Sequence, residues 1–178
     1  MKRIIAPVIL LLLVINAFAQ VKTTITKSNI TFEIKNLGIK TSGTIGGLQA
    51  DIQFDPAHLN TASIEATADV KTVNTNNDSR DEHLRTDEFF DVARFPKITI
   101  KSVSFKHKSG DKYEGQFNLT LKDKTKLIDL PFTYTENGAA VSIKGSFKLN
   151  RLDFGVGGSS LVLSDDVVVN IEVEIAKG

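Results

Sequence analysis

Apolar and polar residues alternate along most of this chain with a period of two. Such alternation is typical of β-strands that bury one face, because successive side chains point to opposite sides of a sheet. Short polar turns, such as residues 108–111 and 136–138, separate the alternating segments. Eight strands are predicted, at residues 30–34, 48–54, 64–70, 98–105, 113–121, 128–134, 141–149 and 167–175.

The fourth segment changes phase partway along. Ile98 and Ile100 share one parity, whereas Val103 and Phe105 have the other. A single extra residue would return Phe105 to the apolar face, so we predict a β-bulge near Lys101-Ser102.

The connections between the segments determine how the strands pair. Parallel neighbours need crossovers of a dozen or more residues, so short turns indicate antiparallel pairs. The sequence offers no long helix to cover the apolar face, and closing the sheet on itself buries that face and removes its exposed edges. We predict one all-β domain over residues 20–178, an eight-stranded antiparallel up-and-down barrel.

Alternation does not state which face lies inside. A small outer-membrane barrel is apolar on the outside and polar within. The chain has no Trp and only two Tyr, too few for the aromatic girdles of such a barrel, and its polar faces carry lysines. We therefore favour an apolar interior over the outer-membrane alternative.

Residues 1–19 have the pattern of a signal peptide. Lys2 and Arg3 precede an almost wholly apolar run at residues 4–15, and Ala17-Phe18-Ala19 supplies a small-x-small cleavage pattern. The apolar run is shorter than the roughly 20 residues of a membrane span. We predict cleavage near Ala19 and a periplasmic or secreted mature protein without stable membrane insertion.

Composition narrows the chemistry further. The absence of cysteine excludes disulfides, thiolate metal ligands and a cysteine nucleophile. Removing Lys2 and Arg3 from the 22 basic residues leaves 20 against 21 acidic ones, whereas a nucleic-acid partner would require a basic surface. His58, His83 and His107 are isolated and lack metal-ligand spacing. We predict no nucleic-acid partner, no metal or cofactor, and no catalysis.

Residues 76–96 depart from the alternation and are dense in charge. Ser79 and Glu82 have the spacing of a helix capping box. Asp81 and Arg85 have the i,i+4 spacing of an ion pair. These signals predict a short helix within an otherwise strand-rich chain.

The same segment carries an apolar ridge. Thr86, followed by two acidic residues, indicates a second helix start. Leu84, Phe89 and Phe90 form the ridge, and helices this short need a surface to pack against. The nearest such surface is the open end of the barrel. We predict a short helical lid at residues 78–91.

Alternation also leaves open whether the barrel is hollow. Several inward positions are small, namely Ala50, Ala66, Ala68, Gly115 and Gly145. Eight strands lie at the boundary between a packed core and a cavity for one ligand, and glycines also mark barrel bends. A filled barrel acting as a structural or protein-interaction module stays open beside a hollow barrel that holds a long hydrocarbon chain.

The lid segment also resembles a known family. The run Thr75…Arg80-Asp81-x-His83-Leu84-Arg85…Phe89-Phe90-Asp91…Pro96 is similar to the signature of the YceI-like family, with further matches at Gly47-Leu48-x-Ala50-x-Ile52-x-Phe54-Asp55, Arg151-x-Asp153-Phe154-Gly155 and Leu163-x-Asp165-x-Val167. The matches extend from about Ser28 to Ile175. The resemblance implies an eight-stranded, lipocalin-like barrel that is exported to the periplasm, binds a polyisoprenoid lipid in an elongated apolar pocket, and performs no catalysis.

This chain departs from the family pattern at several positions. Asn36 stands where the first strand of the family often has a histidine, and Val156-Gly157-Gly158 replaces a common aromatic residue. Residues of this kind shape the pocket, so the departures bear on the ligand and not on the fold.

Alternation and the lid together predict the residues that contact a hydrocarbon chain. Burying such a chain contributes about 25 cal/mol for each Å² of apolar surface removed from water. The predicted lumen residues are Phe32, Ile34, Phe54, Ala68, Phe117, Phe132 and Phe147, with Phe89 and Phe90 at the end of the lumen.

A polar lipid head, such as a phosphate or a quinone, needs partners at the mouth. The candidates are Arg80, His83, Arg85 and Arg151, because guanidinium groups bind phosphate in a fork. In the alternative interpretation, which we favour, Arg80 and Arg151 pair with Asp81 and Asp153 and tie the lid to the rim. The predicted function is carriage or storage of an isoprenoid, isoprenoid quinone or other long-chain lipid, and a homodimer through the outer face stays open.

Overall fold

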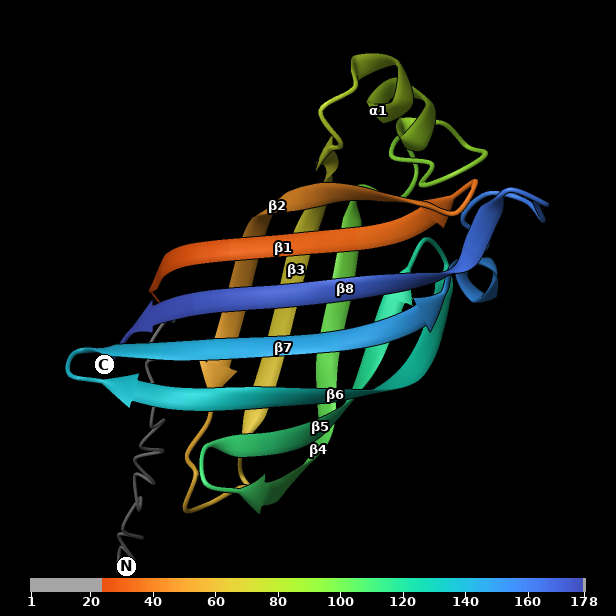
Figure 1. Cartoon of the computed structure of the whole chain (residues 1–178). Coiled ribbons are helices and arrows are strands. Elements are labelled where there is room, and N and C mark those ends of the chain that lie inside the picture. The colour runs from red at the N-terminus through yellow and green to blue at the C-terminus, as the bar shows by residue number, and fades with distance from the viewer. Residues whose placement is uncertain (1–23, 178) are drawn as a thin grey trace, which may run out of the picture.

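A computed structural model describes residues 24–177, which form one closed barrel of eight antiparallel strands (Figure 1). Each strand pairs with its neighbours in sequence, and β8 pairs with β1 to close the barrel. The strands are β1 Ile25–Asn36, β2 Ile39–Gln53, β3 Ser63–Asn74, β4 Lys97–Ser109, β5 Lys112–Leu121, β6 Lys124–Asn137, β7 Ala140–Asn150 and β8 Leu163–Ala176. The predicted fold is confirmed. The predicted signal peptide lies outside the described residues.

Two short helices lie at the same end of the barrel, which we call the lid end (Figure 1). The α-helix α1, Asp78–Arg85, follows β3, and the 3-10 helix η1, Arg151–Phe154, follows β7. The backbone N–H of Gly157, just after η1, donates to the carbonyl of Glu88, just after α1, at 2.9 Å. No helix among residues 24–177 is long and apolar enough to cross a membrane.

The outward face of the barrel carries charged pairs across neighbouring strands. Lys101 lies 3.4 Å from Glu65, and Lys148 lies 2.6 Å from Asp166. Exposed pairs of this kind contribute at most about 1 kcal/mol each. Apolar residues occupy the inward face, so the arrangement is opposite to that of the outer-membrane alternative.

The predicted bulge is present in β4, one residue beyond the position we expected. Ser102 pairs with Phe117 and Ser104 pairs with Gln116, so Val103 is the extra residue. Val103 is exposed, whereas the Phe105 ring packs edge-on against the ring of Phe117 with centroids 5.6 Å apart.

The barrel is closed by aromatic rings at the end opposite the lid. Phe54 lies in the middle of this aromatic floor, with its ring centroid 4.8 to 5.5 Å from those of Phe105, Tyr113, Phe132 and Tyr134. Burial raises the pKa of Tyr134 above its ordinary value, because removal from water disfavours the charged phenolate.

The wall of the barrel is incomplete between β6 and β7. These strands pair only over Phe132–Asn137 and Ala140–Gly145, so their lid-end halves have no ladder between them. Phe154 of η1 is only 2 % exposed and belongs to the same apolar cluster as Ile128 and Leu149, which come from the two separated strands. We infer that Phe154 seals this gap.

Phe154→Ala should lower the free energy of unfolding by about 3–5 kcal/mol, because truncating a buried phenylalanine removes apolar contacts and leaves a cavity. Urea unfolding measures the loss. Leu127→Ala is the matched control: Leu127 borders the same gap from β6 but is 56 % exposed. It should change stability by no more than about 0.5 kcal/mol. Equal losses in the two variants would contradict the sealing role of Phe154.

Candidate functional site

The barrel encloses a cavity of about 400 Å³ between the lid and the aromatic floor. All eight strands contribute apolar side chains to its wall, which include Ile30, Ile45, Ala66, Ile98, Phe117, Leu130, Ile143 and Val167. The volume lies within the roughly 300–1,000 Å³ of small-molecule sites. The interior is therefore hollow, which contradicts the filled-barrel alternative.

Alanines on adjacent strands account for part of this space. Ala50 of β2 and Ala66 of β3 are directly opposite each other, and Ala66 is opposite Ile100 of β4. Ala50, Ala66 and Ala68 all line the cavity. Their methyl groups extend only a short way into the lumen, so this side of the wall is thin.

The inward glycines have a different role from the alanines. A Cβ atom at Gly115 would overlap the ring of Phe117, and one at Gly43 would overlap the ring of Phe32. A Cβ at Gly145 would lie 3.0 Å from Leu130 Cδ1. The glycines accommodate neighbouring side chains, so the size of the cavity depends on the alanines.

The structure brings most of the sequence-predicted lumen residues together. The cavity is lined by Phe32, Ile34, Ala68, Phe89, Phe90, Phe117, Phe132 and Phe147. Phe54 is the exception: it faces inward but belongs to the aromatic floor, below the cavity. Its ring packs against four other aromatic rings and is absent from the cavity lining. The predicted placement of Phe54 on the cavity wall was wrong.

Except for Thr67 of β3, the polar lining residues gather at the lid end, where the cavity has its mouth. The predicted residues Arg80, His83 and Arg151 are among them, together with Asn36, Thr41 and Thr75, which we did not predict as site residues. Thr41 has the inward parity of Ile45, but the Gly-rich stretch that contains it reads as a loop. The only sequence signal at Asn36 is its departure from the histidine that is common in the family.

The lid helix is fastened to the end of β3 through Thr75. The carboxylate of Asp81, which is 5 % exposed, accepts hydrogen bonds from Thr75 N at 2.9 Å and from Thr75 Oγ1 at 2.5 Å. Arg80 Nε donates to Thr75 Oγ1 at 2.7 Å, and Arg80 Nη2 donates to the Thr75 carbonyl at 2.8 Å. Thr75 thus connects both side chains to the barrel.

Several local predictions for this segment were wrong. The helix N-cap is Asn77, whose side chain accepts from the N–H of Arg80, and not Ser79. Arg85 does not pair with Asp81, because Asp81 binds Thr75 and the Arg85 guanidinium donates to the carbonyls of β3 at Lys71 and Val73. No second helix starts at residue 86, which is the C-cap of α1; turns follow over residues 87–94.

The apolar underside of the lid packs onto the barrel, as predicted. Leu84 and Phe90 contact the cluster that contains Ile45, and Phe89 contacts the cluster that contains Phe117. Gly157 allows this approach, since a Cβ there would lie 2.9 Å from the ring of Phe89. Residues 78–91 therefore form a lid over the lumen.

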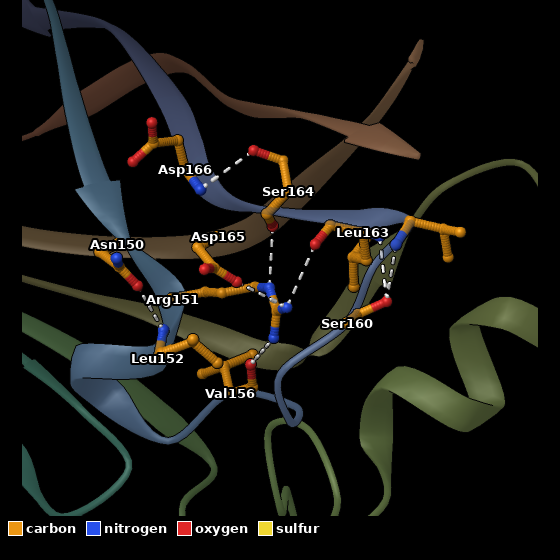
Figure 2. Close-up of polar contacts among 10 residues, drawn as sticks. Asn150, Arg151, Leu152, Val156, Ser160, Leu163, Ser164, Asp165 and Asp166 are labelled. Carbon is orange, nitrogen blue, oxygen red and sulfur yellow. Dashed lines mark hydrogen bonds and ion pairs between the residues drawn. The ribbon is translucent and has the colours of Figure 1, made fainter. Parts of the chain in front are cut away.

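Arg151 holds the opposite side of the mouth together (Figure 2). Its Nε donates to the Ser164 carbonyl and its Nη1 to the Val156 carbonyl, both at 2.9 Å. Its Nη2 donates to Asp165 Oδ1 at 3.1 Å and to the Leu163 carbonyl at 3.4 Å. The guanidinium thereby links η1, the loop after it and the start of β8.

We predicted that Arg151 pairs with Asp153. Its acidic partner in the structure is instead Asp165. Arg80 also lacks its predicted direct partner: it binds Thr75, which in turn binds Asp81. In both arginines the Nε and Nη2 atoms donate to protein acceptors. These contacts are those expected of residues that brace the mouth.

Arg151→Lys should lower the free energy of unfolding by at least about 2 kcal/mol, because one ammonium cannot reach acceptors on three sides and each unsatisfied buried acceptor costs ~1–3 kcal/mol. Asp165→Asn should cost under about 1 kcal/mol, since the Asp165 side chain is 44 % exposed and exposed ion pairs contribute little. Urea unfolding of both variants checks this. If Asp165→Asn lowered the free energy of unfolding as much as Arg151→Lys does, the ion pair with Asp165, and not the bonds to the carbonyls, would be the source of the stabilisation.

A closed antiparallel barrel with a lidded apolar cavity defines a hollow barrel of the lipocalin-like class. Within that class, the YceI-like domain matches residues 21–175 of this chain. The protein YceI of Salmonella arizonae is 32 % identical over 154 residues, which cover 82 % of this chain and 79 % of that protein. The chain belongs to the YceI-like family, which confirms the resemblance seen in the lid segment.

Two solved structures share the fold. BcnA of Burkholderia cenocepacia superposes with a TM-score of 0.79 at 24 % identity, covering 83 % of this chain and 95 % of that one. A polyisoprenoid-binding domain from Saccharophagus degradans, implicated in plant cell wall breakdown, superposes with a TM-score of 0.71 at 16 % identity. It covers 88 % of this chain and 98 % of that domain.

Proposed function

We propose that this protein holds one long apolar lipid, with a chain of the polyisoprenoid or isoprenoid-quinone type, in the cavity under the lid. The main support for this proposal is the cavity itself. It provides about 400 Å³ of apolar space, and its polar lining residues lie mainly at one end. A tail can occupy the apolar part while a head group stays at the mouth. The related Saccharophagus domain, described as polyisoprenoid-binding, supports the same class of ligand.

The mouth has polar groups available for a head group. The side chain of Asn36 makes no hydrogen bond within residues 24–177, and it lines the cavity. His83 Nε2 lies 2.9 Å from Glu88 Oε2, which leaves its Nδ1 for a further partner. We propose that Asn36 and His83 contact the head group, while Arg80 and Arg151 keep the mouth in shape.

The proposed role is binding without covalent chemistry. Among residues 24–177 no group of three or more His, Asp or Glu side chains could hold a metal ion. The side chains of His83 and Glu88 are both more than half exposed. Carriage or storage of the lipid uses the affinity of the cavity alone.

Affinity for linear primary alcohols should rise about fourfold with each added methylene, because burying one CH₂ contributes about 0.8 kcal/mol. The rise should stop when the cavity is full. Displacement of an apolar fluorescent dye measures each dissociation constant.

Ala66→Phe should lower the affinity for the longest alcohols at least tenfold and move the plateau to shorter chains, because the ring enters the cavity. Glu65→Phe is the matched control, since it places the same ring on the outward face of β3 beside Ala66. It should bind like the wild type. No chain-length dependence in the wild type, or unchanged binding by Ala66→Phe, would contradict the proposed site.

We also propose that the protein works in the periplasm or outside the cell, which rests on the signal-peptide pattern of residues 1–19. Cell fractionation followed by intact-mass measurement should find a chain that starts near Gln20 in the exported fraction. A full-length chain in the cytoplasm would contradict this proposal.

A further inference from the structure

Four exposed aliphatic side chains gather beside the mouth of the cavity. Leu37 is 72 % exposed, Ile39 71 %, Val162 48 %, and Leu161 is as exposed as in an extended chain. The other large apolar side chains exposed within residues 24–177 are Val103, Leu127 and Val168, each on a different strand. We call Leu37, Ile39, Leu161 and Val162 the rim patch.

Two chain segments form the rim patch, and backbone contacts hold them together. The tip of the β1–β2 hairpin and the loop before β8 lie side by side at the lid end (Figure 1), where Leu37 N donates to the Val162 carbonyl at 2.8 Å. Ser160 Oγ accepts from Val162 N at 3.2 Å and from Leu163 N at 3.1 Å, which orders the loop (Figure 2). These bonds bring Leu37 and Val162 next to each other at the rim.

The hairpin turn holds a leucine in a backbone conformation that leucine disfavours. Leu37 and Gly38 form a two-residue turn with φ values of +52° and +78°. Turns with two positive φ angles strongly favour Asn-Gly, because a branched apolar side chain is strained there. Leu37 gains no burial in return, since its side chain is exposed to solvent. A leucine that adopts a disfavoured backbone conformation without gaining stability from burial indicates a functional constraint at this position.

The rim patch is continuous with the lining of the cavity. Asn36, Thr41 and Leu163 line the mouth, and each lies within two residues of a patch residue. Ile39 lies on the same face of β2 as the inward residues Thr41 and Ile45. It is the last paired residue at the lid end, so no side chain from the opposite wall covers it and it stays exposed. The patch thus extends the apolar cavity wall outward to the surface.

The lid side of the mouth has a different character. Asp78, Glu82, Asp87 and Glu88 are exposed on the lid, which makes that side acidic. On the patch side, Lys35 and Lys40 stand opposite each other just below the hairpin tip. We therefore expect the rim patch, and not the acidic lid, to contact an apolar surface.

We propose that the rim patch docks this protein onto a lipid bilayer, with Leu37 and Leu161 inserted among the lipids so that the mouth faces the source of the cargo. This rests on the proposed function, because a lipid ligand has to be taken from a membrane or returned to one. Interfaces between proteins are enriched in aromatic residues and arginine, whereas this patch is purely aliphatic on two protruding tips. Aliphatic side chains gain from burial in hydrocarbon without needing a complementary partner surface.

The test uses flotation with phosphatidylcholine vesicles, alone and with phosphatidylglycerol. The double variant Leu37→Asn/Leu161→Ser replaces the two most exposed side chains of the rim patch. Asn suits the positive φ of residue 37, so folding is retained. The matched control, Val103→Ser/Leu127→Ser, removes two exposed aliphatic residues from β4 and β6, strands that carry no residue of the rim patch. The patch variant should partition onto both vesicle types at least tenfold more weakly than the wild type, and the control within twofold of it.

A second measurement separates this proposal from the cavity function. Dissolved linear alcohols, tested without vesicles, should bind the patch variant as tightly as the wild type. Absence of vesicle binding by the wild type, or equal binding by the patch variant, overturns the docking proposal and leaves the cavity function standing. Patch-dependent vesicle binding without any alcohol binding supports docking and overturns the cavity function. A wild-type dimer that the patch variant abolishes would assign the patch to a second copy of the chain and overturn docking.

Discussion

The interior volume of a closed eight-stranded barrel is set by its strands, and the inward side chains decide how much of it is filled. Here alanines face one another across β2 and β3, with Ala66 at the centre of this thin part of the wall. An empty apolar space costs the fold the dispersion contacts that larger side chains would make. A longer side chain at Ala66 could restore some of these contacts, and the proposed lipid would supply them in its place.

The two ends of the barrel close the cavity in different ways. At one end five aromatic rings, with Phe54 in the middle, form the floor. At the other end the lid and η1 are held by polar networks centred on Thr75 and Arg151. A lipid with one polar head and one apolar tail fits such an asymmetric chamber in one orientation, head toward the lid.

The sequence predicted the features that depend on local pattern. Alternation identified all eight strands and the bulge in β4, because burial of one face imposes a period of two. It missed the first half of β2, where small and glycine residues from Thr41 to Gly47 read as a loop although they complete the barrel. The lid was predictable because Leu84, Phe89 and Phe90 form an apolar ridge on a charged segment, which needs a surface to cover it.

Contacts that join distant parts of the chain were not predictable in this way. Arg151 binds Asp165 and carbonyls up to thirteen residues away, because the turn after η1 brings them around the guanidinium. The hollow interior was likewise undecided in the sequence, since alanine and glycine have similar sizes but opposite roles here. The central claim is tested most directly by native mass spectrometry of the protein purified from its own host. We expect a species heavier than the chain by the mass of one lipid, which disappears in the Ala66→Phe variant. A uniformly ligand-free wild-type protein would contradict the account.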